Sequence, residues 1–247
     1  MSVLKNVFAR IWAVWGIIIF AILMLMVFPF FLVCMLWKEP KRSHISYRIF
    51  RIWMNIYLPF IGVFIKIKGK ENFEKGKNYI VLCNHNSFMD VPVSSPYVVG
   101  ANKTIAKIEM SRIPIFGMIY KLGSVLVDRK DKDSRVKSYI LMKDVLAMGL
   151  HMIIYPEGTR NKTGKPMKEF HDGAFKLAVD TLKPILPAVL FGTARILPNN
   201  KSFYLLPGKV EFHFLPAINV KPGDNADSLK QQAFDLMWEE YAGESSQ

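Results

Sequence analysis

YIVLCNHNSFMD, running from Tyr79 to Asp90, is the stretch of sequence that decides the fold of this chain. Its first five residues are apolar and rich in β-branched and aromatic side chains, which predicts a short buried strand ending at Cys83. His85 and Asp90 then lie five residues apart across a turn. If Asp90 opens the next helix, its carboxylate can hold one imidazole nitrogen while the other faces outward, which makes a general base. A helix-capping Asp beside a half-buried His remains the alternative.

After Gly62 short apolar runs alternate with helical stretches, and this pattern predicts the α/β class: a largely parallel or mixed central sheet flanked by helices. Residues 62–247 are expected to form this α/β domain, and residues 1–61 two hydrophobic helices that anchor the chain to a membrane. The predicted strands are Val63–Lys68, Tyr79–Cys83, Thr104–Ile108, Ser124–Asp128, His151–Tyr155, Pro184–Phe191 and Lys209–Leu215. The predicted helices between them cover about 91–98, 135–148, 173–181 and 227–241.

The N-terminal region contains 27 uncharged residues in a row, from Ile11 to Trp37. Such a run is long enough to cross a bilayer and too long for the core of a signal peptide. Because both flanks are basic, the helix either spans the membrane or dips into one leaflet, and the sequence does not choose. A second helix, from about Ser43 to Phe64, mixes aromatic and basic residues with aliphatic ones, which suits the headgroup interface. Packing of that helix on the α/β domain is the alternative.

The net charge of the 247-residue chain is +13, and it is unevenly distributed. Residues 1–70 contain ten Lys or Arg against Glu39 alone, so +9 of this charge flanks the most apolar part of the chain. This placement indicates a membrane surface rather than nucleic acid, for which no recognition module is present in the sequence. Cys34 and Cys83 lie in apolar surroundings, and no Cys or His cluster has the spacing of ligands. Neither a disulfide nor a metal site is therefore expected.

Three further strand ends carry cationic side chains. Lys107 and Arg129 each close an apolar run, and Arg160 closes the turn YPEGTR that follows the run HMIIY. Because the carboxyl ends of parallel strands meet at one edge of a sheet, we expect these three cations to converge on one anion beside His85. A solvated surface charge remains the alternative for each of them. No GxSxG elbow accompanies His85, so a serine hydrolase of the α/β kind is not supported.

Several motifs of this chain, in their order and spacing along the sequence, resemble the motifs of one known family. That family is the 1-acylglycerol-3-phosphate (lysophosphatidic acid) acyltransferases, a group of glycerolipid acyltransferases. The matching segments are NHNSFMD with the block NHxSxxD, Gly123–Arg129 with the second block, YPEGTR with FPEGTR, Leu186–Val189 with the proline-centred fourth block, Lys107 and Glu109 with a lysine-acid pair, and Phe170–Phe175 with FxxGAF. This chain departs from the family pattern at Tyr155, where Phe is usual, and at His171 and Asp172, where basic residues are common.

The resemblance implies an enzyme that transfers a fatty acyl group from a thioester donor to the sn-2 hydroxyl of lysophosphatidic acid, giving phosphatidic acid. His85 would take the hydroxyl proton and Asp90 would orient the imidazole. The residues implied in binding the acceptor phosphate are Lys107, Arg129, Glu157, Gly158, Thr159 and Arg160, and Glu157 is also a candidate for orienting Arg160. No cofactor or metal is implied, and the donor substrate would be acyl-CoA or an acylated acyl carrier protein.

The same resemblance implies membrane lipids as partners and a location at the cell membrane, with the catalytic domain on the cytoplasmic side. Two alternatives remain open. One is an acyltransferase of the same fold that acts on glycerol-3-phosphate or another lysophospholipid, and the other is a catalytically inactive membrane-binding scaffold. The choice of donor, the preferred chain length and the oligomeric state do not follow from the sequence.

Overall fold

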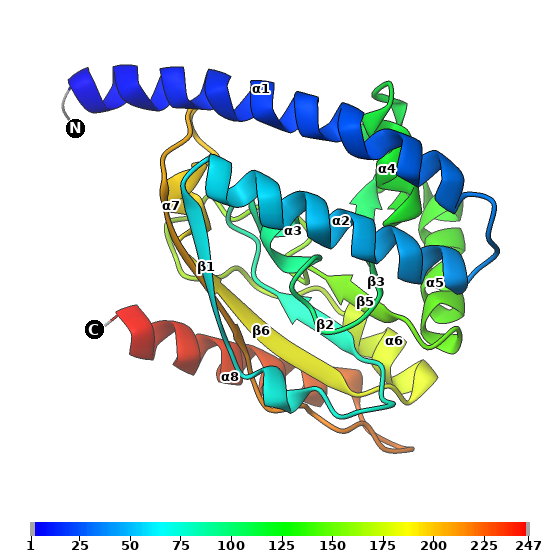
Figure 1. Cartoon of the computed structure of the whole chain (residues 1–247). Coiled ribbons are helices and arrows are strands. Elements are labelled where there is room, and N and C mark those ends of the chain that lie inside the picture. Colours follow the sequence, from blue (N-terminus) through cyan, green and yellow to red (C-terminus); the bar gives the residue numbers. More distant parts are fainter. Residues whose placement is uncertain (1–2, 246–247) are drawn as a thin grey trace.

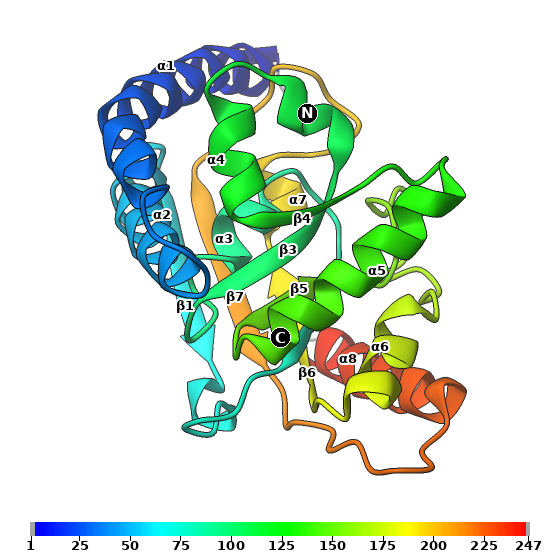
Figure 2. The same ribbon diagram turned by 90° about the vertical axis from the view of Figure 1, so that its right-hand side faces the viewer.

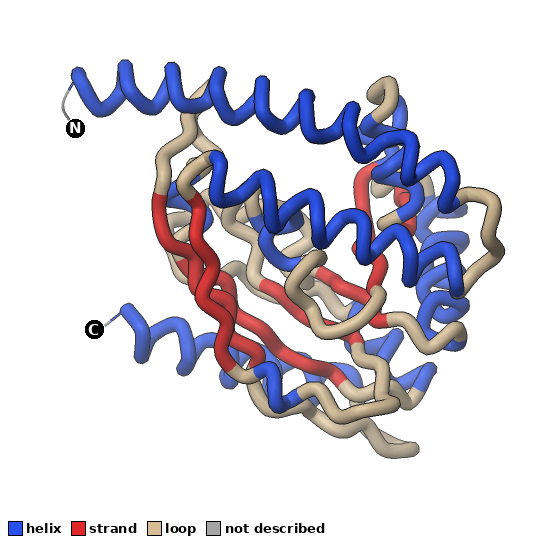
Figure 3. Tube along the Cα trace, in the orientation of Figure 1, coloured by secondary structure: helices blue, strands red, loops and turns tan. Residues whose placement is uncertain are grey.

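A seven-stranded sheet forms the centre of the computed structural model, which describes residues 3–245 (Figures 1 and 3). The strand order is β1-β7-β6-β2-β5-β3-β4, and among these strands only the β6–β7 pair is antiparallel. The strands are β1 (Val63–Lys68), β2 (Ile80–Cys83), β3 (Asn102–Lys107), β4 (Ser124–Val127), β5 (His151–Ile154), β6 (Ile185–Phe191) and β7 (Gly208–Phe214). The predicted α/β class with a largely parallel sheet is confirmed, and each predicted strand is present within two residues of its expected ends.

Helices cover both faces of the sheet, so that the molecule has three layers (Figure 2). The helices are α1 (Val3–Cys34), α2 (Lys41–Phe60), α3 (Asp90–Ser94), α4 (Phe116–Leu122), α5 (Lys132–Ala147), α6 (Gly173–Thr181), α7 (Thr193–Ile196) and α8 (Ala226–Ser245), with 3-10 turns η1 (Lys70–Asn72) and η2 (Ile108–Arg112). One apolar cluster packs helices α1, α2, α3 and α4 against one face of the sheet. A second cluster packs α5, α6 and α8 against the other face.

Strand β2 shows why a strand at the centre of this sheet is a continuous run of apolar residues. All four of its residues are buried. Val81 and Cys83 belong to the cluster on the α1–α2 side, whereas Ile80 and Leu82 belong to the cluster on the α5–α8 side. Successive side chains of a strand point to opposite faces, so a strand between two helical layers has no polar face.

The two N-terminal helices form a hairpin that lies along one side of the molecule (Figure 1). Helix α1 is long and apolar enough to cross a membrane by length and composition. In the structure, however, it packs lengthwise on the protein: Ala9 accepts a backbone hydrogen bond from Leu205 N at 3.1 Å, and Trp12 Nε1 donates to the carbonyl of Ile61 at 3.0 Å. The hairpin and the sheet share one apolar cluster, and the division of the chain at residue 61 stays a prediction.

Helix α2 is shorter than predicted. It ends at Phe60 rather than at Phe64, because Gly62 adopts a left-handed conformation (φ 69°) that turns the chain into β1. One face of α2 packs against the α/β domain through the buried side chains of Trp53 and Met54. This is the alternative that the sequence left open for the helix, although its other face exposes apolar side chains such as Ile52.

An ion pair fastens the hairpin to the sheet. Glu39, in the turn between α1 and α2, accepts hydrogen bonds from Lys103 Nζ of β3 at 2.8 Å and from Ser43 Oγ at 2.6 Å. Burial raises the pKa of Glu39, but the hydrogen bonds from Lys103 and Ser43 outweigh it and bring the pKa to about 2. The carboxylate is therefore ionised at neutral pH and holds α2 in place over β3.

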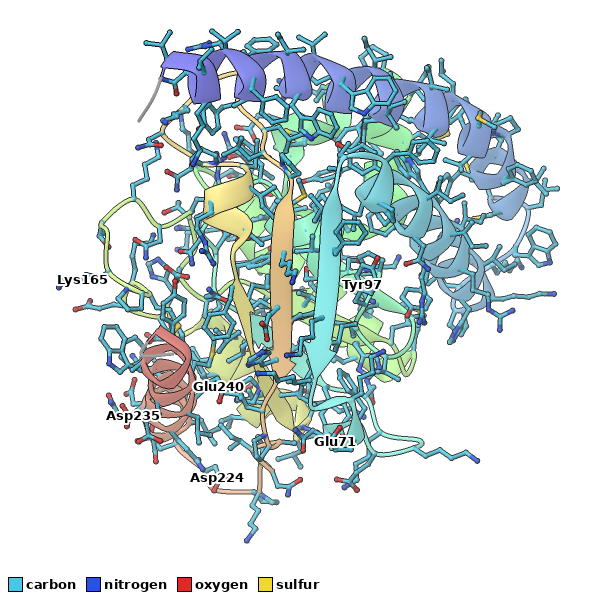
Figure 4. All side chains as sticks on the ribbon, turned by 60° about the vertical axis from the view of Figure 1, so that its left-hand side comes forward. Glu71, Tyr97, Lys165, Asp224, Asp235 and Glu240 are labelled. Carbon is cyan, nitrogen blue, oxygen red and sulfur yellow. The ribbon has the colours of Figure 1, made fainter. Side chains whose placement is uncertain are left out.

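Some helices differ from the sequence-based expectation. Helix α3 ends at Ser94 instead of at residue 98, which agrees with the presence of Pro96 two residues later. Helices α4 and α7 were not predicted, since seven and four residues are too short to show a helical period. At the C-terminus α8 is anchored by Glu240, whose carboxylate lies 2.6 Å from Nδ1 of the buried His213 on β7 (Figure 4).

Candidate active site

The side chains of His85 and Asp90 are hydrogen-bonded to each other at the carboxyl end of β2. Asp90 is the first residue of α3, and its Oδ2 lies 2.7 Å from Nδ1 of His85. The same oxygen accepts backbone hydrogen bonds from Asn86 and Ser87, each at 2.7 Å, which fix the turn between the two residues. Asp90 is fully buried, whereas the His85 side chain is 18% exposed. An Nδ1–H that donates to a carboxylate leaves Nε2 as the proton-accepting nitrogen.

The backbone N–H and carbonyl of His85 are both hydrogen-bonded, like its ring. Its N–H donates to Glu157 Oε1 at 2.6 Å, and its carbonyl accepts from Asn161 N at 2.6 Å. The second carboxylate oxygen, Glu157 Oε2, accepts from the backbone N–H of Lys168 at 2.9 Å. Burial raises the pKa of Glu157 above its ordinary value. The loops after β2 and β5 are thus linked directly at the proposed base.

The contacts of Glu157 are with backbone groups of the protein, and its role in binding the acceptor stays a prediction. The residue was grouped with those that bind the acceptor phosphate or orient Arg160. Its side chain is instead 1% exposed, and both of its oxygens accept backbone N–H groups. A buried carboxylate would repel a phosphate, and the hydrogen bonds of Glu157 instead hold the peptide N–H groups of His85 and Lys168.

The YPEGTR turn also uses its own backbone donors. Gly158 N donates to the carbonyl of Tyr155 at 3.0 Å, and Thr159 N donates to the carbonyl of Glu157 at 2.8 Å. The Gly158 N–H is therefore already paired within the turn, and the contact of Gly158 with phosphate stays a prediction. Gly158 is required for another reason, because its φ is +70° and an added Cβ would lie 2.8 Å from His171 Nε2. The Gly158 carbonyl accepts a hydrogen bond from Arg129 Nη1.

The cations from three strand ends line one cavity together with His85. Arg129 follows β4, Lys107 ends β3, and Arg160 follows β5. Arg160 stacks on the ring of Phe88, with its guanidinium carbon 3.3 Å from the ring centroid, and Lys107 Nζ lies 2.8 Å from Glu109 Oε1. The structure thus brings together the three predicted cations, and Thr159 lines the same cavity.

The cavity has a volume of about 670 Å³ and is lined by both polar and apolar side chains. His85 and the cations belong to its polar lining. The rest is mostly apolar and is enclosed by residues from α1, α2, α3, η2 and α4: Phe20, Phe31, Phe50, Trp53, Met54, Val91, Met110, Phe116 and Ile119. The N-terminal hairpin is therefore one wall of the cavity.

Three supporting residues could not be assigned from the sequence. Asn84, immediately before His85, donates from Nδ2 to the Leu190 carbonyl at 3.0 Å and accepts from Leu190 N at 2.7 Å. The ring of Tyr155 packs against that of His85 in a tilted arrangement, with centroids 4.4 Å apart, and its hydroxyl lies 2.7 Å from Ser94 Oγ. Asn199 Nδ2 bridges the carbonyls of Asn86 and Asn161. Their signal in the sequence was weak, because Asn is common in loops and Tyr in cores.

The hydroxyl of Ser87 and the thiol of Cys83, both close to His85 in the sequence, have structural roles. Ser87 Oγ donates to the carbonyl of Leu197 at 2.6 Å and accepts from Met89 N at 3.0 Å. Cys83 is fully buried, and burial raises the pKa of its thiol, so that it stays protonated. Within residues 3–245, no three His, Cys, Asp or Glu side chains cluster as metal ligands would.

Comparison with known proteins identifies the family. The sequence profile of the acyltransferase family matches residues 64–191. A curated 1-acyl-sn-glycerol-3-phosphate acyltransferase of Chlamydomonas reinhardtii is 34% identical over 167 residues, which are 67% of this chain and 49% of that protein. A chloroplastic enzyme of the same name from Arabidopsis thaliana is 31% identical over 86% of this chain and 57% of its own length. The chain thus spans about half the length of these relatives.

The fold is also that of a solved structure. The crystal structure of the 1-acyl-sn-glycerophosphate acyltransferase PlsC from Thermotoga maritima superimposes with a TM-score of 0.84, covers 98% of both chains and has 22% sequence identity. Together with the profile match, which spans β1 to β6 and includes His85, Asp90 and the YPEGTR turn, this shows that the chain belongs to the acyltransferase family.

Proposed function

We propose that this protein transfers a fatty acyl group from a thioester donor to the sn-2 hydroxyl of lysophosphatidate, giving phosphatidate. The observation that carries the proposal is the cavity that His85 lines together with cationic side chains and a large apolar surface. A lysophosphatidate molecule matches both, with a phosphate at one end and a long acyl chain at the other. The relatives named as 1-acyl-sn-glycerol-3-phosphate acyltransferases support this choice of acceptor.

In the proposed reaction, Nε2 of His85 takes the proton of the sn-2 hydroxyl as its oxygen attacks the thioester carbonyl. Asp90, 2.7 Å from Nδ1, stabilises the resulting imidazolium. The tetrahedral intermediate then collapses, the carbon–sulfur bond breaks, and the imidazolium returns the proton to the departing thiolate. The products are phosphatidate and a free thiol, and no acyl-enzyme is needed.

Charge and position support Arg129 and Arg160 as the residues that bind the acceptor phosphate. Both guanidinium groups line the cavity beside His85, and an arginine can hold a phosphate through two parallel N–H groups. Lys107 forms an ion pair with Glu109 and adds a weaker, longer-range attraction for the phosphate. The same positive charge would favour the oxyanion that forms on the thioester carbonyl.

We also propose that the hairpin holds the protein in one leaflet of the membrane, with the catalytic domain on the cytoplasmic side. Because α1 packs along the protein for most of its length, it cannot cross a bilayer perpendicularly while the domain stays outside. Its other face exposes a long row of apolar side chains, including Ile18, Ile22 and Leu25, that lipid would cover. The cavity wall made by α1 and α2 would then lie beside the acyl chains of the acceptor.

The test is an acceptor and donor panel with the full chain purified in detergent. Oleoyl-CoA and acylated acyl carrier protein are each supplied with lysophosphatidate, glycerol-3-phosphate and lysophosphatidylcholine. We expect efficient transfer to lysophosphatidate, and loss of turnover by at least about a thousandfold in His85→Ala. Preference for either of the other acceptors, or full activity of His85→Ala, would overturn the proposal.

A further inference from the structure

A second cavity lies next to the first and has the opposite chemical character. It has a volume of about 460 Å³ and is lined by Thr159, Arg160, Lys162, Thr163 and Lys168. Two of these residues, Thr159 and Arg160, also line the first cavity, so the two spaces meet at the YPEGTR turn. We propose that this second cavity binds the phosphate groups of the nucleotide head of an acyl-CoA donor. The inference rests on the proposed acyl transfer.

The geometry of the reaction requires a site of this kind. A thioester donor has an apolar acyl chain on one side of its carbonyl carbon and a polar, thiol-bearing head on the other. With the thioester carbonyl beside His85 and the acceptor in the first cavity, the polar head of the donor must extend away from His85 in another direction. The cavity beyond Thr159 and Arg160 adjoins the centre and is lined by side chains that bind anions.

The walls of this second cavity are fixed relative to His85. Lys168 Nζ donates to the Glu157 carbonyl at 3.0 Å and to Thr159 Oγ1 at 2.7 Å, which leaves one of its three N–H groups for a ligand. Asn161 holds the basic turn, because its Oδ1 accepts from Thr163 N and Oγ1 and its Nδ2 donates to the Lys165 carbonyl. The backbone N–H of Asn161 donates to the carbonyl of His85. A ligand held here would therefore have a set position relative to the base.

Charge and shape favour a nucleotide head over an acidic carrier protein. Lys162 and Lys168 place two cations around one concave space, together with two hydroxyl groups and with Arg160, which also lines the first cavity and is shared with the acceptor phosphate. The carboxylate of Glu157, whose backbone carbonyl accepts from Lys168, is buried and accepts backbone N–H groups. The volume lies within the range of about 300–1,000 Å³ found for small-molecule pockets. A carrier protein would instead be bound over a broad surface of about 800 Å².

The chain offers a matched pair of variants to test this. Lys162 lines the second cavity, whereas Lys165, three residues later in the same turn, extends to the outer edge of the molecule and does not line it (Figure 4). Both side chains are exposed, so Lys162→Glu and Lys165→Glu make the same change in net charge without disturbing the core. Two quantities are measured: the affinity of each full-length variant for adenosine 3',5'-bisphosphate by calorimetry, and the KM for oleoyl-CoA and for lysophosphatidate.

We expect Lys162→Glu to weaken bisphosphate binding and to raise the KM for oleoyl-CoA, each by about tenfold or more, as for a lost charge-assisted phosphate contact. The KM for lysophosphatidate should be unchanged, and Lys165→Glu should resemble the wild type. Equal effects of the two variants would indicate diffuse charge or a carrier-protein surface and would overturn the proposal. A rise in the KM for lysophosphatidate alone would assign the cavity to the acceptor and would also overturn it.

The two proposals can fail separately. If the wild type acylates lysophosphatidate and Lys162→Glu leaves bisphosphate binding unchanged, the donor site is wrong and the function stands. If the wild type transfers no acyl group from either donor, the function is wrong, and the calorimetric titration still reports whether the cavity binds a nucleotide phosphate.

Discussion

Replacement of Asp90 by Asn removes one charge from the proposed base while keeping the shape of the side chain. In the structure a single oxygen, Asp90 Oδ2, receives the His85 ring and two backbone N–H groups, each at 2.7 Å. An amide oxygen can keep these contacts, but it cannot stabilise the imidazolium by charge. With charge centres about 4 Å apart and an effective dielectric constant of about 20, that stabilisation is about 4 kcal/mol. The expected loss in kcat is therefore about a thousandfold.

The assay measures thiol release from oleoyl-CoA at saturating lysophosphatidate, and thermal unfolding checks that the variant is folded. Glu157→Gln is the matched control. It also neutralises a buried carboxylate beside His85, but Glu157 contacts the peptide N–H rather than the ring. We expect Glu157→Gln to lose much less kcat than Asp90→Asn. A loss below about tenfold in Asp90→Asn, or equal losses in both variants, would refute the idea that Asp90 acts by stabilising the imidazolium.

Further predictions concern stability, the membrane face and pH. Asn84→Ala should lower the free energy of unfolding by about 3 kcal/mol in denaturant titrations, because it leaves a buried N–H and C=O without partners. Ile22→Glu, on the outer face of α1, should weaken binding to anionic vesicles about tenfold or more, whereas Ile140→Glu, equally exposed on α5, should not. Stability should also fall between pH 4.5 and about 2, since the folded Glu39 stays ionised where the unfolded one binds a proton; Lys103→Met should reduce this dependence.

Most of the fold could be predicted from the sequence, because its central strands β2, β5 and β6 lie between two helical layers. Such strands are apolar on both faces and appear as uninterrupted runs, of which Ile80–Cys83 is the clearest. The edge of the sheet at which the candidate site lies followed from the same argument. Once β2, β3, β4 and β5 are parallel, His85, Lys107, Arg129 and Arg160 must emerge at one edge, and the cavity that they share agrees with this.

The direction of individual side chains could not be predicted in the same way. Glu157 and Arg160 are separated by two residues of one turn, yet Glu157 points into the protein and accepts backbone N–H groups while Arg160 stacks on an exposed Phe88. Nothing in the order of charges distinguishes these outcomes, because they depend on which backbone donors the neighbouring loops leave unpaired. The contribution of α1 to the cavity was also hidden, since a row of apolar residues has the same appearance whether it faces lipid or protein.

The amide of Asn84 has a consequence for how the sheet ends. Parallel pairing between β2 and β6 stops at Cys83 and Ala188, and the next contact between the strands is the double hydrogen bond from the Asn84 side chain to Leu190. The Asn84 side chain thus takes the place of one more pair of backbone hydrogen bonds. The main chain at residue 84 can therefore leave the sheet while β2 and β6 stay connected. Strand β2 and the loop that leaves the sheet at a sharp angle can therefore follow each other directly in the sequence. The Leu190 amide, protected by a side chain instead of by a neighbouring backbone, reports in hydrogen exchange on the integrity of that junction.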